Sequence, residues 1–176
     1  MYEIRDPVHQ TIAFTEKEAA VIDHPIFQRM RYIRQLGLSY LVYPGSTHDR
    51  FSHMLGASHI AGRVWDNIVS VSGDLLRKYY SNADLAYFRQ VVRYAALLHD
   101  VGHAPFSHVS EKLMPPFGEL EIPRHWYIDP KPKNPAAHED YSVMLIGAIG
   151  DDRSLKIGPD MAQDIEIGRA SCRERV

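Results

Sequence analysis

The sequence predicts an all-α domain, a helical bundle preceded by a short N-terminal β-hairpin. Apolar residues recur at helical spacing through most of the 176 residues. Residues that commonly cap or stop helices stand at the ends of these periodic stretches. Strands are predicted only for Tyr2–Phe14, a segment interrupted at Asp6 and Pro7. Hydrophobic residues make up 45% of the chain and charged residues 24%, which is typical of a globular domain.

The first two helices are indicated by their start signals. Thr15 and Glu18 have capping-box spacing, in which each side chain bonds the backbone amide of the other, and apolar residues follow at 19–22. Pro25 suits the first turn of a second helix. Its apolar residues fall on one side, its arginines lie outside that stripe, and Gly37 is expected to end it.

Two longer helices follow. After the turn-like residues 43–46, apolar or small residues keep a 3.6-residue period over 51–69. A second periodic stretch runs from about Asp84 to Asp100, and Gly102 is expected to stop it.

Prolines divide the remainder of the chain. Pro105 permits a short helix through Leu113, which the next two prolines must end. Six prolines between residues 115 and 135 predict a long surface loop. Helix is expected to resume near Ala137 and to be weakened by the glycines at 147 and 150.

Composition excludes several classes of protein. No apolar run approaches the roughly 18 residues that span a bilayer, and the first residues lack the apolar stretch of a signal peptide, so we expect a cytoplasmic protein without membrane contact. Cys172 is the only cysteine, which leaves histidine and carboxylate as metal ligands. A net charge of -2 gives no overall attraction for nucleic acid.

Histidines and an aspartate gather at two helix ends. His53 lies at the head of the third helix, and His99 and Asp100 lie at the tail of the fourth. Asp100 follows an apolar run that should be buried, where an ionised carboxylate needs a cation or several donors. Imidazole and carboxylate together suit manganese, iron, cobalt, nickel or zinc better than calcium. These residues predict a divalent transition-metal site.

Other histidines have explanations that need no metal. His9, His24, His59 and His125 are expected to be core or surface residues without a ligand. Glu111 lies three residues after His108, on the same helical face, where it could hold that ring in one tautomer. The alternative for this pair is a surface ion contact.

Three segments carry a resemblance to a known family. They are His48–His53, His99–His108 and His138–Ser142, within a similarity that runs from about Tyr2 to Ile149. The sequence resembles the HD-domain phosphohydrolases, and among them the deoxynucleoside triphosphate triphosphohydrolases. The resemblance implies an HD-domain helical bundle for residues 1–150.

The resemblance also implies a reaction and roles for the matching residues. The family hydrolyses a deoxynucleoside triphosphate at the α-phosphorus to a deoxynucleoside and inorganic triphosphate, with Mg²⁺ as a possible companion of the substrate. His53, His99 and Asp100 match its metal ligands, and Gln35 and Leu36 match residues at the 3′ side of the sugar. The family's residues around the substrate phosphates correspond to Arg50, His103, His108 and His138. His108 and Glu111 match the proton-transfer pair.

A regulatory site and an assembly are implied in the same way. Asp23, Gln28 and Arg31 match positions where animal members bind a regulatory guanine nucleotide that drives tetramer assembly, so a homo-oligomer is expected of the full-length protein. The alternative is that the arginines of this second predicted helix are only solvated surface residues. Arg5, Met54 and Glu111 depart from the residues usual in the family.

The end of the chain departs further. The family completes its metal site with a second aspartate on a later helix, and nothing between 151 and 176 resembles that segment. Residues 166–176 resemble the translation of a sequencing adapter and are expected to lie outside the native fold; 151–165 are left unassigned. We therefore expect an inactive N-terminal fragment. Alternatives are a phosphohydrolase of another nucleotide or nucleic-acid phosphoester, or a non-catalytic nucleotide-binding module.

Overall fold

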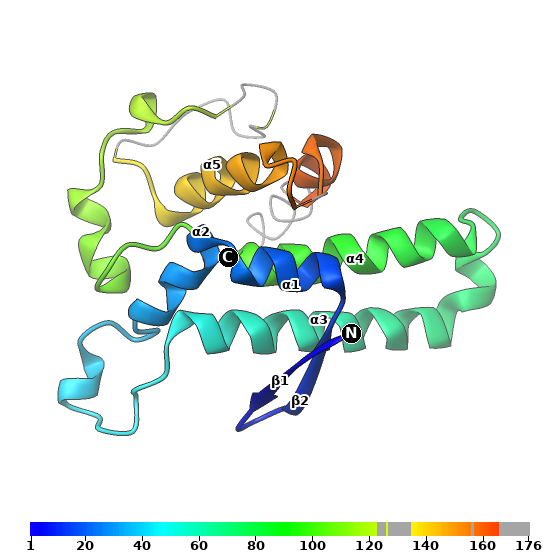
Figure 1. The fold of residues 1–176 in the computed structure, drawn as a ribbon, viewed down its shortest axis with the longest axis horizontal. Coiled ribbons are helices and arrows are strands. Elements are labelled where there is room, and N and C mark those ends of the chain that lie inside the picture. The colour runs from blue at the N-terminus through cyan, green and yellow to red at the C-terminus, as the bar shows by residue number, and fades with distance from the viewer. Residues whose placement is uncertain (123–125, 127–134, 156, 166–176) are drawn as a thin grey trace.

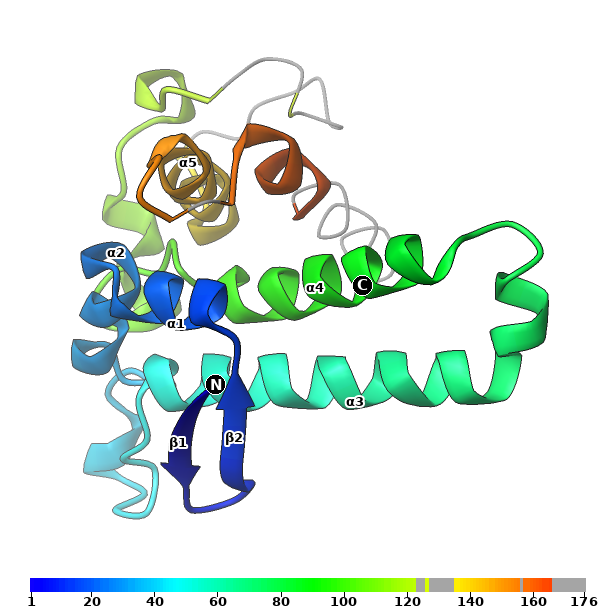
Figure 2. The ribbon, with the colours of Figure 1, turned by 45° about the vertical axis from the view of Figure 1, so that its right-hand side comes forward.

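Helices dominate the computed structural model, which describes residues 1–122, 126, 135–155 and 157–165. The two longest helices, α3 (Arg50–Leu76) and α4 (Asn82–Leu98), run antiparallel and side by side. Helix α5 (His138–Asp151) lies on the side of α4 away from α3, and a two-stranded hairpin crosses α3 (Figures 1 and 2). The prediction of an all-α bundle with an N-terminal hairpin is confirmed.

The hairpin pairs β1 (Tyr2–Asp6) with β2 (Gln10–Phe14) in antiparallel register. Asp6 shapes the turn, because its Oδ1 accepts hydrogen bonds from the amides of Val8 (2.8 Å) and His9 (2.7 Å). Ile12 and Phe14 alternate onto the buried face of β2. The hairpin therefore closes one side of the core.

Helix α1 (Glu16–Asp23) begins with the predicted capping box: Thr15 Oγ1 accepts from the Glu18 amide, and the Glu18 side chain accepts from the Thr15 amide. Glu18 is buried, and its Oε1 lies 2.5 Å from Nε of Arg93 on α4. A Cβ on Gly62 of α3 would lie 2.9 Å from Nη1 of Arg93. Glycine at position 62 thus leaves room for the Arg93 guanidinium to reach Glu18.

The second predicted helix is shorter than expected. Helix α2 (Pro25–Gln28) passes into a 3₁₀ turn (Arg29–Tyr32), and the chain is extended at Ile33. Arg34 forms a β-bridge with Asp49, and the Arg50 amide donates to the Ile33 carbonyl at 2.9 Å. A helix to Gly37 is therefore wrong, because this backbone pairs with the segment that leads into α3.

Helix α3 is longer than its apolar period suggested. Asp49 caps it by accepting from the Ser52 amide at 2.8 Å, and it continues past Val69 to Leu76. Ser81 and Asp84 form a capping box at the start of α4. The facing sides of these helices bury Met54, Leu55, Tyr94, Leu97 and Leu98.

The later segments differ from two expectations. The short helix after Pro105 is a 3₁₀ helix, Ser107–Leu113, and a single 3₁₀ turn, Phe117–Glu119, interrupts the expected loop, whose residues 123–125 and 127–134 lie outside the described part of the chain. Residues 159–165 are helical, and Ala162 and Ile165 pack into the core. The predicted artefactual tail, 166–176, lies outside the described residues. In the described residues no helix is long and apolar enough to cross a membrane.

Candidate metal centre

Three side chains, one from α3 and two from the turn that directly follows α4, converge at the open end of the α3–α4 pair. His53 Nε2 lies 3.3 Å from His99 Nε2 and 3.8 Å from Asp100 Oδ2, and His99 Nε2 lies 3.3 Å from Asp100 Oδ2. Two ligands of a tetrahedral zinc-type ion, each about 2.1 Å from it, are about 3.4 Å apart. The three atoms are therefore spaced as ligands of one ion would be.

The tautomer of His99 favours the same conclusion. Its Nδ1 lies 2.8 Å from the carbonyl oxygen of Ala96, which can only accept a hydrogen bond. Nδ1 consequently carries a hydrogen, which leaves Nε2, facing Asp100 and His53, as the atom whose lone pair can bind an ion once its own proton is displaced. Lone pairs that face one another at about 3.3 Å suit a cation between them, and two imidazoles with one carboxylate fit a borderline transition metal.

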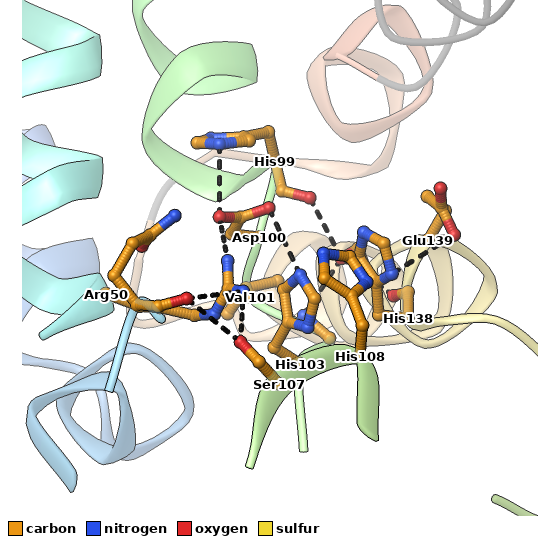
Figure 3. A network of polar contacts seen from close by, with 12 residues as sticks. Arg50, His99, Asp100, Val101, His103, Ser107, His108, His138 and Glu139 are labelled. Atoms are coloured by element: carbon orange, nitrogen blue, oxygen red, sulfur yellow. Dashed lines mark hydrogen bonds and ion pairs between the residues drawn. The ribbon is translucent and has the colours of Figure 1, made fainter. Parts of the chain in front are cut away.

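Asp100 is buried, as its apolar context predicted, and it has a cation beside it. Arg50, also buried, forms an ion pair with Asp100 through Nη1 and donates to Ser107 Oγ through Nη2 (Figure 3). Burial opposes ionisation of Asp100, but His99 and Arg50 outweigh it, so the pKa of this carboxyl lies well below its ordinary value. The resemblance implied that Arg50 contacts the substrate phosphates, which stays a prediction; in the structure its two Nη atoms bond Asp100 and Ser107.

A second cluster adjoins the first. Glu111 Oε1 lies 2.6 Å from His138 Nδ1 and 2.8 Å from His108 Nδ1, so one carboxylate oxygen accepts from both rings. His103 stacks on His138 with ring centroids 3.7 Å apart, and its Nε2 lies 3.6 Å from Asp100 Oδ1. These four side chains thus lie together and reach the first group through His103.

The charges of the second cluster follow from burial and from the hydrogen bonds to Glu111. Burial is the main cause that lowers the pKa of His103, to about 2, and the neighbouring His138 adds to it. His103 is therefore neutral at physiological pH. Burial would raise the pKa of Glu111, but hydrogen bonds from His108 and His138 hold it below its ordinary value. Glu111 is thus an anionic acceptor between two rings.

Gly102 and Ser142 join α5 to the turn after α4. The Gly102 amide donates to Ser142 Oγ at 2.9 Å, and that hydroxyl lies 3.1 Å from the carbonyl oxygens of His99 and His138. A Cβ on Gly102 would lie 2.1 Å from the His138 carbonyl oxygen. Gly102 was expected only to stop a helix. Its second role, the close approach of α5, brings His138 to the site.

The remaining predicted positions lie at different places. The Gln35 carbonyl accepts from Ser107 Oγ at 3.2 Å, which puts this residue beside Arg50, while Leu36 is half-exposed next to it. Gln28 Oε1 accepts from Arg31 Nε at 2.7 Å, and the Arg31 guanidinium lies 3.5 Å above the Phe51 ring. Asp23 is exposed at the end of α1.

Sequence reasoning assigned no role to Arg29, Ser107 or Ser142. Ser107 and Ser142 stand inside the motif strings, so their position was a signal, but hydroxyl groups that bond buried carbonyls and guanidinium groups have no recognisable spacing. Arg29 lies outside the apolar stripe of the predicted second helix, a position that gives no sign that its guanidinium reaches the turn after α4.

The family model of the HD domain matches residues 50–165. An uncharacterized protein of Methanocaldococcus jannaschii is 44% identical over 111 residues, which cover 63% of this chain and 21% of the relative. Deoxynucleoside triphosphate triphosphohydrolase SAMHD1 is 38% identical over 82% of this chain in Bos taurus and 34% identical over 89% in Homo sapiens. The chain spans about a fifth of the length of these relatives (21% and 22% of the mammalian proteins).

Proposed function

The chain belongs to the HD domain family, and from the geometry of its candidate metal centre we propose that it is the metal-binding part of a phosphohydrolase that acts on deoxynucleoside triphosphates. The products would be a deoxynucleoside and inorganic triphosphate. The observation that carries the proposal is the spacing of His53, His99 and Asp100, with ligand atoms 3.3 to 3.8 Å apart. The similarity to SAMHD1 supports the substrate class.

His53, His99 and Asp100 would hold the ion. When bound, a divalent ion of this kind polarises phosphoryl oxygens and lowers the pKa of water. Arg50 pairs with Asp100 and keeps the carboxylate ionised and fixed. Among the described residues the group contains three ligands, so positions remain open for water and substrate oxygen.

The second cluster would handle the proton. Hydrolysis at the α-phosphorus adds water to phosphorus and breaks the bond to the 5′ oxygen of the sugar, which must take up a proton as it leaves. Glu111 occupies Nδ1 of both His108 and His138, so the proton that can be exchanged with substrate is on Nε2. His108 is largely exposed, which suits it as the general acid, and Glu111 orients its ring.

The test compares phosphoesters. The full-length protein with Mn²⁺ would be incubated with dGTP, dGMP and a 3′-phosphorylated oligonucleotide, and products would be separated by chromatography. We expect inorganic triphosphate from dGTP and a specificity constant at least about a hundredfold above the other two substrates, equivalent to roughly 2.7 kcal/mol. Absence of triphosphate, with turnover of another phosphoester, would contradict the proposed substrate.

The regulatory site and the assembly stay predictions. Gln28 and Arg31 contact each other, but this pair would also form on a solvated helix. For the 176-residue chain itself we propose weak metal retention and little turnover, because three protein ligands hold an ion less firmly than four.

A further inference from the structure

Arg29 reaches from the 3₁₀ turn after α2 to the turn that follows α4. Its Nη1 donates to the carbonyl oxygen of His103 at 2.8 Å, and its Nη2 donates to the carbonyl oxygen of Val101. These two carbonyls stand on either side of Gly102. The side chain thus spans more than seventy residues of sequence to hold one three-residue turn.

The two carbonyls depend on this guanidinium. Neither accepts a backbone amide among the described residues, because the turn follows the last residue of α4 and continues no helix. A planar fork of N–H groups can bond two nearby carbonyl oxygens at once, which a single ammonium group cannot do in the same geometry. Arg29 is half-buried, and none of the ion pairs between described residues includes it. Its bonding capacity is therefore directed at the turn.

The turn carries two residues of the site. Asp100 precedes Val101, and the His103 amide donates to the Asp100 carbonyl at 3.0 Å. The His103 ring in turn lies 3.6 Å from Asp100 Oδ1 and stacks on His138. Any rotation of the peptides at 101 or 103 would move the carboxylate and the imidazole relative to each other.

We infer that Arg29 is a positioning residue, which holds the carbonyls of Val101 and His103 so that Asp100 and His103 face the same reacting centre. The inference deepens the proposed function and rests on it, since it assigns both residues to that centre. It also gives the 3₁₀ turn after α2 a direct mechanical connection to the site, through one side chain.

Amide hydrogen exchange tests the inference without metal or substrate. In Arg29→Met, which keeps much of the side-chain volume, we expect exchange of the Gly102 and His103 amides to accelerate by about tenfold or more, because the turn opens locally. Exchange of the Leu97 amide in α4 should change by less than about twofold. Arg34→Met is the matched control, because Arg34 also donates to a carbonyl, that of Thr47, away from this turn.

Arg29→Lys distinguishes the effect of the planar guanidinium donors from the effect of the positive charge. Lysine keeps the positive charge but presents one donor head, so we expect it to leave exchange at 102 and 103 accelerated. Full protection in Arg29→Lys, unchanged exchange in Arg29→Met, or equal acceleration throughout α4 would each overturn the inference. The last result would show a general loss of stability.

Cobalt binding gives a second measurement. Co²⁺ added to the 176-residue chain reports ligand geometry through its visible absorption bands, and at saturation these bands do not depend on the fraction of protein that is folded. We expect Arg29→Met to bind Co²⁺ about tenfold more weakly with altered bands, whereas Arg34→Met should match the unchanged protein. Unaltered bands and affinity in Arg29→Met would overturn the inference. If the full-length protein also fails to bind Co²⁺, the proposed function fails, while the exchange experiment still decides the role of Arg29.

Discussion

Replacing Gly102 by alanine should separate α5 from the metal centre. The new Cβ would lie 2.1 Å from the His138 carbonyl oxygen, 2.3 Å from the Ser142 amide nitrogen and 2.8 Å from Ser142 Oγ. An ordinary contact needs about 3.4 Å, so the backbone of α5 must retreat by about 1.3 Å. Overpacking of this kind costs about 1–3 kcal/mol, and the lost hydrogen bond to Ser142 adds about 1 kcal/mol.

Urea unfolding measures this cost. We expect the free energy of unfolding of Gly102→Ala to fall by about 2–4 kcal/mol, with a Tm lower by about 4–16 °C. The matched control is Gly45→Ala, because nothing lies within 4 Å of a Cβ at that position. The same variant should disturb the His138–Glu111 pair, visible in the ring resonances of His138. If Gly102→Ala and Gly45→Ala unfold alike, the close approach of α5 has been misjudged.

Three further outcomes are expected. Asp100→Asn should weaken Mn²⁺ binding by about a hundredfold in calorimetry, since it removes the anionic ligand. Asp66→Asn should not, because the Asp66 carboxylate pairs with Arg89 between α3 and α4, away from the three candidate ligands. Equal affinity in the two variants would contradict the ligand role. Glu18→Gln should lower the free energy of unfolding by about 3 kcal/mol because it leaves Arg93 buried without its carboxylate, against less than about 0.5 kcal/mol for the exposed Glu16→Gln. Because the pKa of His103 is lowered to about 2, the unfolded chain binds a proton near pH 6.5 that the folded chain does not. The free energy of unfolding without metal should therefore fall as the pH drops below 6.5, by up to about 1.4 kcal/mol per pH unit. His103→Asn should reduce this slope, and an unchanged slope would count against a buried neutral ring.

Local signals in the sequence predicted the helix starts well. Thr15 and Glu18 form the predicted capping box because it depends on residues three apart. The second helix failed because its end is set by pairing between Arg34 and Asp49, which no local pattern records. Apolar spacing also could not distinguish a 3₁₀ helix from an α-helix over 107–113. The start of that helix is set by Phe106 and Ser107, which both have positive φ.

The candidate site was predictable in composition but not in its connections. The run before Asp100 correctly indicated a buried carboxylate, and the spacing of His108 and Glu111 correctly indicated their contact. The same spacing could not show that Glu111 is shared with His138, 27 residues later. Nor could it show that Arg50 is enclosed, since that depends on how the segment before α3 packs on Ser107.

The Glu18–Arg93 pair also fixes the phase of α4. Arg93 and His99 stand six residues apart on the same stiff segment, so turning one turns the other. A slip by one residue would swing every side chain of α4 through about 100° and shift it by about 1.5 Å along the axis. His99 would then no longer face His53. The buried Glu18–Arg93 pair therefore helps to keep His99 opposite His53. Breaking this pair should weaken metal binding under conditions where α4 is still folded.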